Sequence, residues 1–175
     1  METATGMRAP ERWLVFLRVV VGAWFAKGAV AKLTIALAWG FLPVPAASER
    51  WIGMMPKLLA KYAADDPFTA YRAFLLDTVI PNALLYANLT ACGEAFVGIS
   101  LLAGLLTPVG AIVGFALTLV YGLAVQHMSA GQLGFHVMLA AMMIALFFAR
   151  AGRTWGVDAR LRAARPGSAI VRRLT

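Results

Sequence analysis

The chain has 175 residues, of which 61% are hydrophobic and only 14% are charged, and its mean hydropathy is +0.76. These values exclude an ordinary soluble domain and indicate an integral membrane protein whose main partner is the lipid bilayer. The net charge of +8 comes from residues that flank apolar runs, where membrane orientation explains it, so we predict no nucleic-acid partner.

The first apolar run predicts a membrane-spanning helix over about residues 13–38. It contains Arg18 near its start, which can extend to the nearby membrane interface, and Lys27 and Lys32 at deeper positions. A lysine inside a span needs a partner or access to water, so both lysines are candidates for a functional site.

Residues 39–81 form the longest segment outside the predicted spans, and its charges sum to zero. Apolar residues recur there at helical spacing, although Pro56 predicts a break or a helix start. Asp66 followed by Pro67 is typical of the beginning of a helix. We predict one or two short amphipathic helices on the membrane surface.

Three more spans are predicted over about residues 83–106, 109–126 and 133–149, with turns between them that leave room only for antiparallel neighbours. The expected fold is all-α, an integral membrane four-helix bundle that forms a single membrane domain over residues 1–175. A basic tail over 150–175 follows the last span.

The tail carries seven arginines and one aspartate, whereas residues 39–81 are neutral. Because basic flanks stay in the cytoplasm, we predict that the tail and the amino terminus are both cytoplasmic and that residues 39–81 lie outside. The single cysteine, Cys92, excludes an internal disulfide and a thiolate metal site built by this chain alone, and no metal ligand set is predicted.

Glu94 is the only carboxylate in the apolar stretch 82–106 and lies near its middle. An ionised side chain at such a depth costs about 2.5 to 3.5 kcal/mol, so it must be neutral, paired or hydrated. Helical spacing places it on one face with Ala87, Thr90 and Ala91, which suits contact with a neighbouring helix.

Counting helix rise from the outer ends of the first two spans puts Lys27 and Glu94 at the same depth, roughly 16 to 18 Å below the surface. The same count pairs Lys32 with Asn88 at about 9 Å. It leaves open which lysine contacts Glu94, and whether the pair is only a structural ion pair or part of a binding or proton-handling site. Tyr121 and His136 also fall in the outer half, which predicts a polar pocket that opens outward.

Three segments resemble the DoxX/DoxD family of small four-helix membrane proteins. They are Leu17-Arg18 followed by Gly22 and AKGAVAKL, the stretch GEAFVGISLLAGLLTPVGA over 93–111, and the closing AGRTWGVDARL over 151–161. The long segment after the first span is more similar to the DoxD branch, the small subunit of thiosulfate:quinone oxidoreductase.

The resemblance implies a subunit of a sulfur- or quinone-linked oxidoreductase in a prokaryotic cytoplasmic membrane, with quinone as electron acceptor. In that function Glu94 is the candidate catalytic residue, and the candidates for substrate or quinone binding are Lys27, Lys32, Asn88, Tyr121 and His136. The chain has no flavin, haem or iron–sulfur motif, so we predict no built-in cofactor and, at most, one subunit of an enzyme.

Two other functions remain open at this stage. The protein could be a non-catalytic scaffold that recruits soluble redox or sulfur-transfer enzymes through its arginine tail, or a carrier of a small molecule or ion. A homo-oligomer is compatible with each function. The sequence alone identifies neither the substrate nor the partner.

Overall fold

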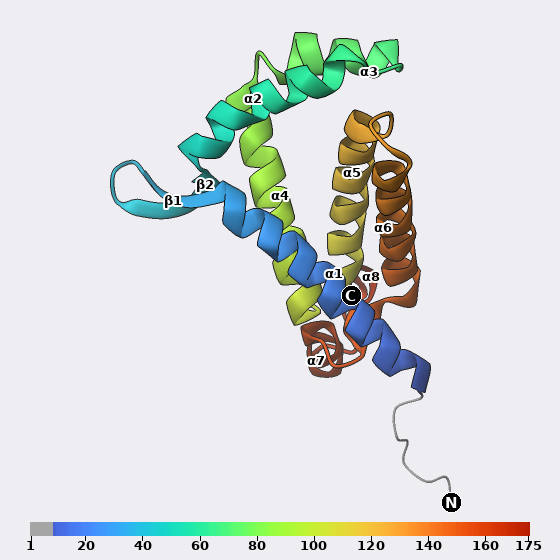
Figure 1. Cartoon of the computed structure of the whole chain (residues 1–175). Helices are drawn as coiled ribbons and strands as arrows, with labels where there is room; N and C mark the ends of the chain where they lie inside the picture. The colour runs from blue at the N-terminus through green and yellow to red at the C-terminus, as the bar shows by residue number, and fades with distance from the viewer. Residues whose placement is uncertain (1–8) are drawn as a thin grey trace, which may run out of the picture.

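The computed structural model describes residues 9–175 and has four long helices, α1 (Ala9–Lys32), α4 (Ala83–Ala103), α5 (Thr107–Val125) and α6 (Ala130–Ala149) (Figure 1). All four are long and apolar enough to cross a membrane. The predicted helical membrane bundle is therefore confirmed. The later three helices differ by no more than three residues at either end from the predicted spans.

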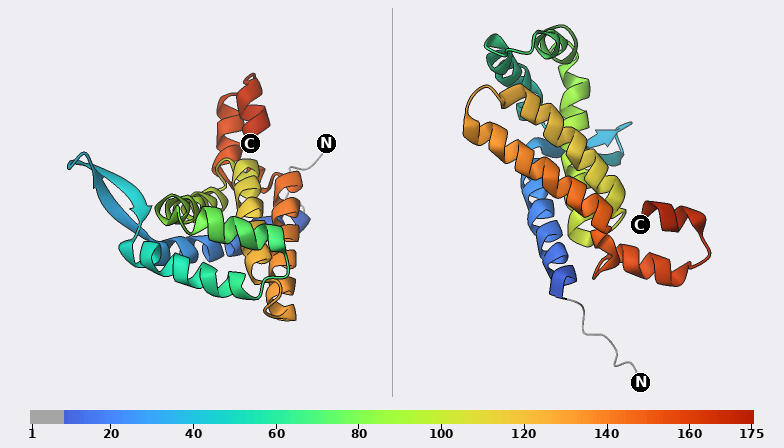
Figure 2. Two further views of the ribbon diagram at one scale, coloured as in Figure 1. Left: turned by 90° about the horizontal axis from the view of Figure 1, so that it is seen from above. Right: turned by 90° about the vertical axis from the view of Figure 1, so that its right-hand side faces the viewer.

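The first span is shorter than predicted, because its last six residues form a strand. Strand β1 (Leu33–Ala38) pairs antiparallel with β2 (Leu42–Ala47), and the two form a hairpin that projects sideways from the bundle (Figures 1 and 2). The chain reverses at Trp39 and Gly40, where φ is +52° and +82°. The residues of β1 are as apolar as those of α1, so hydropathy could not separate strand from helix.

The hairpin leads into α2 (Glu49–Ala64), where Ser48 caps the first turn by accepting a hydrogen bond from the Trp51 amide at 3.3 Å. The predicted break at Pro56 does not occur, since the helix continues through that residue. The Ser48 cap fixes the helix start at Glu49, seven residues before Pro56. The burial of Trp51 and Met55 holds the turns before Pro56 in place.

After α2, the chain forms α3 (Thr69–Phe74) and the short π-helix η1 (Leu75–Val79) before it enters α4. Asp66 accepts a hydrogen bond from the Phe68 amide at 2.9 Å, but it does not cap the helix as predicted, because α3 begins at Thr69 and Phe68 is its cap residue. The Tyr71 hydroxyl donates to the Val120 carbonyl of α5 at 2.6 Å. Burial, followed by the negative charge of Asp66, raises the pKa of Tyr71 to about 12, so the phenol remains a hydrogen-bond donor at neutral pH.

Glycines bring α1 and α4 into backbone contact. A methyl group added at Gly98 would lie 2.8 Å from the amide nitrogen of Ala26, and one at Gly22 would lie 2.9 Å from that of Leu102. Because real Cβ atoms do not approach backbone so closely, these positions require glycine for the observed helix spacing. The close contact fixes the position of α1 beside Glu94.

The basic tail forms the 3₁₀ turn η2 (Ala151–Arg153) and the helices α7 (Val157–Ala164) and α8 (Ala169–Leu174), which make a small arm at one end of the bundle (Figure 2). We call this the tail end, and we call the opposite end, which carries α2 and α3, the α2 end. The fully buried Asp158 caps α5 by accepting hydrogen bonds from the amides of Leu106 at 2.7 Å and Thr107 at 3.0 Å.

Arg18 does not extend to the membrane interface as predicted. Its side chain is 2% exposed and donates to the carbonyls of Ala151 at 2.8 Å, Thr154 at 3.3 Å and Trp155 at 3.4 Å. The tail folds back over this part of α1, so three carbonyls replace the water that the guanidinium would otherwise need. The tail is thus joined to the first helix as well as to α5.

Candidate functional site

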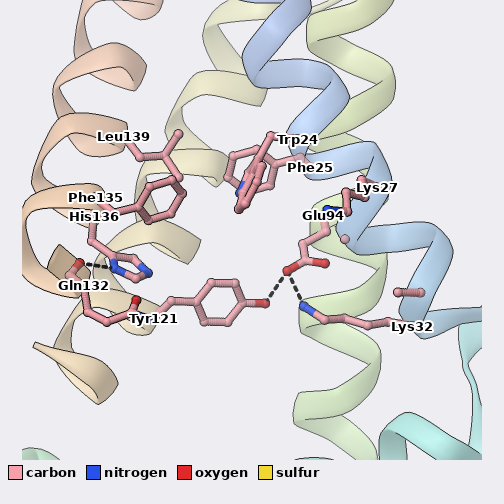
Figure 3. Close-up of a pocket in the computed structure, with 12 residues that line it drawn as sticks. Trp24, Phe25, Lys27, Lys32, Glu94, Tyr121, Gln132, Phe135, His136 and Leu139 are labelled. Carbon is pink, nitrogen blue, oxygen red and sulfur yellow. Dashed lines mark hydrogen bonds and ion pairs between the residues drawn. The ribbon is translucent and has the colours of Figure 1, made fainter. Parts of the chain in front are cut away.

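Three helices place one polar cluster around Glu94 (Figure 3). Glu94, on α4, is buried, and its Oε1 accepts hydrogen bonds from the Lys32 ammonium at 2.5 Å and the Tyr121 hydroxyl at 2.8 Å. Lys32 is the last residue of α1, and Tyr121 belongs to the end of α5 nearest α2. The buried face of α4 includes Ala87 and Ala91, as the helical spacing predicted.

The second carboxylate oxygen, Oε2, is buried and has no hydrogen-bond partner among the described residues. It lies against Gly28 of α1, where a methyl group would be 2.6 Å from it. Glycine at this position therefore leaves the space that the carboxylate occupies. A buried oxygen with a free acceptor site is suited to carry a proton or to accept a bond from a ligand.

The structure answers which lysine pairs with Glu94. It is Lys32, whereas the Lys27 ammonium lies over the Trp24 ring, 5.5 Å from its centroid. The depth count that favoured Lys27 was wrong, because it took Ala38 as the outer end of α1. The helix stops at Lys32, beside the middle of α4, and the chain then leaves the bundle sideways.

Two aromatic rings flank the Lys32 ammonium, those of Trp51 at 4.6 Å and Tyr121 at 5.2 Å from the ring centroids. The Trp51 indole also donates to the Thr90 hydroxyl at 3.3 Å, which ties α2 to α4 beside the site. Aromatic faces stabilise a cation that is removed from water. Sequence analysis did not assign Trp51 to the site, because its helix lies outside the spans and only the folded chain brings it over Lys32.

A pocket of about 390 Å³ adjoins this cluster between α1 and α6. Its polar side is formed by Lys32, Glu94, Tyr121, Gln132 and His136, and the side toward the tail end is aromatic and aliphatic, with Trp24, Phe25, Phe135 and Leu139 (Figure 3). The Trp24 and Phe135 rings, 5.2 Å apart, join α1 to α6 there. The shape suits a ligand with a polar ring and an apolar extension, and the volume is in the range of ligand sites.

Five of the six candidate residues line this pocket, and Asn88 does not. Its amide oxygen accepts a hydrogen bond from the Ala47 amide at 2.8 Å, and its amide nitrogen donates to the Leu84 carbonyl at 2.8 Å. Asn88 therefore holds the hairpin against α4. The depth count placed it at the level of Lys32 but could not show which side of α4 it occupies.

The imidazole of His136 is oriented by its own helix, because Nδ1 bonds the Gln132 carbonyl at 2.8 Å. A carbonyl only accepts, so Nδ1 carries the hydrogen and the Nε2 lone pair is left free in the neutral ring. A smaller cavity of about 230 Å³ lies beneath α2 and is lined by four residues of the first pocket, Lys32, Tyr121, Gln132 and His136. These four residues therefore lie between the Glu94 pocket and the α2 end.

Comparison with known proteins identifies the family. The family model described as "TQO small subunit DoxD" matches residues 13–166, which is most of the chain and includes Lys32, Glu94 and the tail helix α7. No curated protein and no solved structure gives a significant match. The resemblance found in the three sequence segments and the four apolar helices agree with that match. The chain is therefore a membrane protein of the DoxD family, similar to the small subunit of TQO.

Proposed function

We propose that this protein is the membrane subunit of a thiosulfate:quinone oxidoreductase and that its Glu94 pocket binds the quinone head group. The observation that carries the proposal is the buried carboxylate whose Oε1 accepts two hydrogen bonds while Oε2 remains unpartnered beside a pocket of about 390 Å³. Membership of the DoxD family supports the choice of quinone and of a sulfur anion as the two substrates.

Proton balance gives the pocket residues their functions. Joining two thiosulfate ions through a sulfur–sulfur bond releases two electrons and no proton, whereas reducing one quinone to quinol takes up two electrons and two protons. Both protons must therefore reach the quinone oxygens through the protein. Glu94, ionised in its pair with Lys32, takes up one proton from water at Oε2 and passes it to the quinone, and His136 Nε2 takes up and passes the other. Lys32 donates a hydrogen bond to a quinone carbonyl.

Lys27 is the candidate for holding the sulfur anion. Among the described residues the only ion pair is the one between Lys32 and Glu94, so no carboxylate neutralises Lys27. It lines the same pocket at the aromatic side. An uncompensated cation there attracts a dianion toward the quinone site.

The proposal includes a second subunit, because the family is named for a small subunit. The exposed arginines of the tail end, Arg160, Arg165, Arg172 and Arg173, offer a basic surface for such a partner. Native mass spectrometry of mildly extracted protein would report a bound quinone and a co-purifying subunit together. A retained subunit without quinone would favour the scaffold function.

The direct test is Glu94→Gln, assayed with thiosulfate and a short-chain ubiquinone in the complex isolated from membranes. Glutamine keeps an oxygen for Lys32 and Tyr121 but carries no exchangeable acid proton, so we expect turnover to fall about 100-fold or more while the ubiquinone still binds. Asn88→Ala is the control, because Asn88 lies outside the pocket. Unchanged turnover in Glu94→Gln would reject the pocket as the quinone site.

We further propose that the protein lies in a prokaryotic cytoplasmic membrane with its tail end in the cytoplasm, so that the pocket residues nearest α2 face outward. The seven arginines of residues 150–175 support this orientation. Two exposed glycines at opposite ends, Gly53 in α2 and Gly167 between α7 and α8, have no atom within 4 Å of an added Cβ.

Each glycine is replaced by cysteine in a Cys92→Ala background. A membrane-impermeant maleimide should label Gly53→Cys in intact spheroplasts and should label Gly167→Cys only after permeabilisation. Labelling in the reverse order would show the opposite orientation.

A further inference from the structure

The hairpin of β1 and β2 exposes much apolar surface. Residues 33–47 include no charged side chain, and Ile35 and Leu37 on β1 are 70% and 62% exposed. In two views the hairpin extends away from the helices rather than along them (Figures 1 and 2). So much exposed apolar surface indicates contact with lipid or with another chain.

Contacts with α4 give the depth of the hairpin in the membrane. The Ala47 amide bonds Asn88 at 2.8 Å, and the Cys92 thiol lies 3.7 Å from the Pro45 carbonyl. These two positions are five and nine residues after Ala83, where α4 begins, so they lie roughly 8 to 14 Å along the helix. With α4 spanning the membrane, the hairpin is inside the hydrocarbon layer, where its apolar side chains are stable.

The hydrogen-bond pattern shows which backbone groups face away from the hairpin. The Ser48 amide bonds the Lys32 carbonyl at 2.7 Å, so by alternation the outward positions are odd-numbered in both strands. On β2 these are Pro43 and Pro45, which have no N–H, and Ala47, whose N–H bonds Asn88. The outer edge of β2 therefore leaves no donor unpaired.

The outer edge of β1 is different. The backbone N–H groups of Ile35 and Leu37 and the C=O of Ile35 point away from β2, and no group within residues 9–175 bonds them, whereas the Leu37 C=O accepts a hydrogen bond from the Gly40 amide at 3.4 Å. Lipid can cover the side chains but cannot bond the backbone, and each unsatisfied group in hydrocarbon costs several kcal/mol. Open sheet edges do not occur in lipid, so another protein strand must cover this one.

We propose that β1 pairs antiparallel with β1 of a second copy of this chain, which joins two hairpins into one four-stranded sheet within the membrane. Two copies with the same orientation in the membrane are related by a two-fold axis along the membrane normal, and this axis reverses the sideways direction in which the hairpin projects from the bundle (Figures 1 and 2). With the axis at Ala36, Ile35 of each copy pairs with Leu37 of the other. The Ile35 amides then donate to the Leu37 carbonyls of the opposite copy, and the Leu37 amides donate to its Ile35 carbonyls, so each unpaired group gains a partner.

The chemistry of the strand favours its own copy as the partner. The strand carries no charge that would repel an identical strand, and its small residue, Ala36, stands where two antiparallel strands come closest. The β2 edge cannot be used for the same contact, since its prolines lack donors and α4 covers it. The interface is independent of the function proposed for Glu94.

Single cysteines test the register directly. In a Cys92→Ala background in native membranes, Ala36→Cys should form a disulfide dimer under mild oxidation, because paired strands lie about 4.8 Å apart. Val44→Cys is the matched control. It is opposite Ala36 in the hairpin but would be three strand spacings, about 14 Å, from its own copy, and should remain monomeric.

A second variant removes the donor without altering the hairpin. Ile35→Pro deletes one outward N–H, just as Pro43 and Pro45 lack theirs on β2. It should abolish the dimer in native mass spectra and the disulfide crosslink formed by Ala36→Cys. Ile35→Val keeps the N–H and should retain both. The proposal is overturned if Ala36→Cys gives no dimer while the protein is folded, or if it crosslinks only to a different polypeptide.

Discussion

Replacing Lys32 by methionine should lower the free energy of unfolding by about 3 to 5 kcal/mol, because it leaves the Glu94 carboxylate buried without its cation. Lys32 Nζ is 2.5 Å from Glu94 Oε1, and the side chains are 17% and 6% exposed. Methionine retains much of the length and apolar stem of lysine, so the loss measures the missing charge. Denaturation in mild detergent, followed by helical circular dichroism, is the measurement.

Lys27→Met is the matched control for that result. It removes a lysine from the same helix and the same pocket but breaks only a contact with the Trp24 ring, which is worth about 0.5 to 1 kcal/mol. Adding Glu94→Gln to Lys32→Met should recover most of the lost stability, because a neutral amide needs no counter-ion. Equal losses for the two lysine variants would contradict the observed pairing.

Replacing Asp158 by alanine should cost about 2 to 4 kcal/mol, the second largest effect that we expect. Its carboxylate is the acceptor for the amides of Leu106 and Thr107 at the first turn of α5, and the residue is completely buried. Alanine leaves both N–H groups without a partner, at about 1 to 3 kcal/mol each, with some recovery from relaxation. The tail should also become more accessible to protease.

Asp158→Asn gives a graded comparison, since its amide oxygen can still accept one of the two hydrogen bonds. The free energy of unfolding should then fall by about half as much as in Asp158→Ala. Asp65→Ala, at an exposed aspartate after α2, should change the free energy of unfolding by less than about 0.5 kcal/mol. If Asp158→Ala left both the stability and the protease pattern unchanged, the tail would not be part of the folded bundle.

Much of the fold could be predicted from the sequence, because a bilayer imposes a simple rule. Long apolar runs must form helices there, so the number of spans and the ends of α4, α5 and α6 followed from hydropathy. Ser48 and the glycines of the first two long helices have local signals for a cap and for close helix contact. The end of α1 had no such signal, since the apolar sequence LTIALA is compatible with either a helix or a strand.

The candidate site could be predicted only in part, because the sequence signals single unusual residues but not the contacts between distant segments. Glu94 and Lys32 were found because charges are costly inside apolar segments, and Tyr121 and His136 because of their depth. Trp51 and Gln132 were missed, since neither is unusual in its local sequence. Asn88 was misplaced, because a depth count gives the level of a residue along a helix but not the neighbour that it faces.

The sequence by itself determined that this membrane protein has four helices long and apolar enough to cross a bilayer, that it belongs with the DoxD family, and that a buried carboxylate needs a cation. Only the tertiary structure decided that Lys32 is that cation, that Arg18 and Asp158 hold the tail, and that β1 has an open edge. The burial of a charge is a property of one segment, which composition can report. The partner of that charge depends on where three helices and a hairpin meet, and long-range packing alone fixes that position.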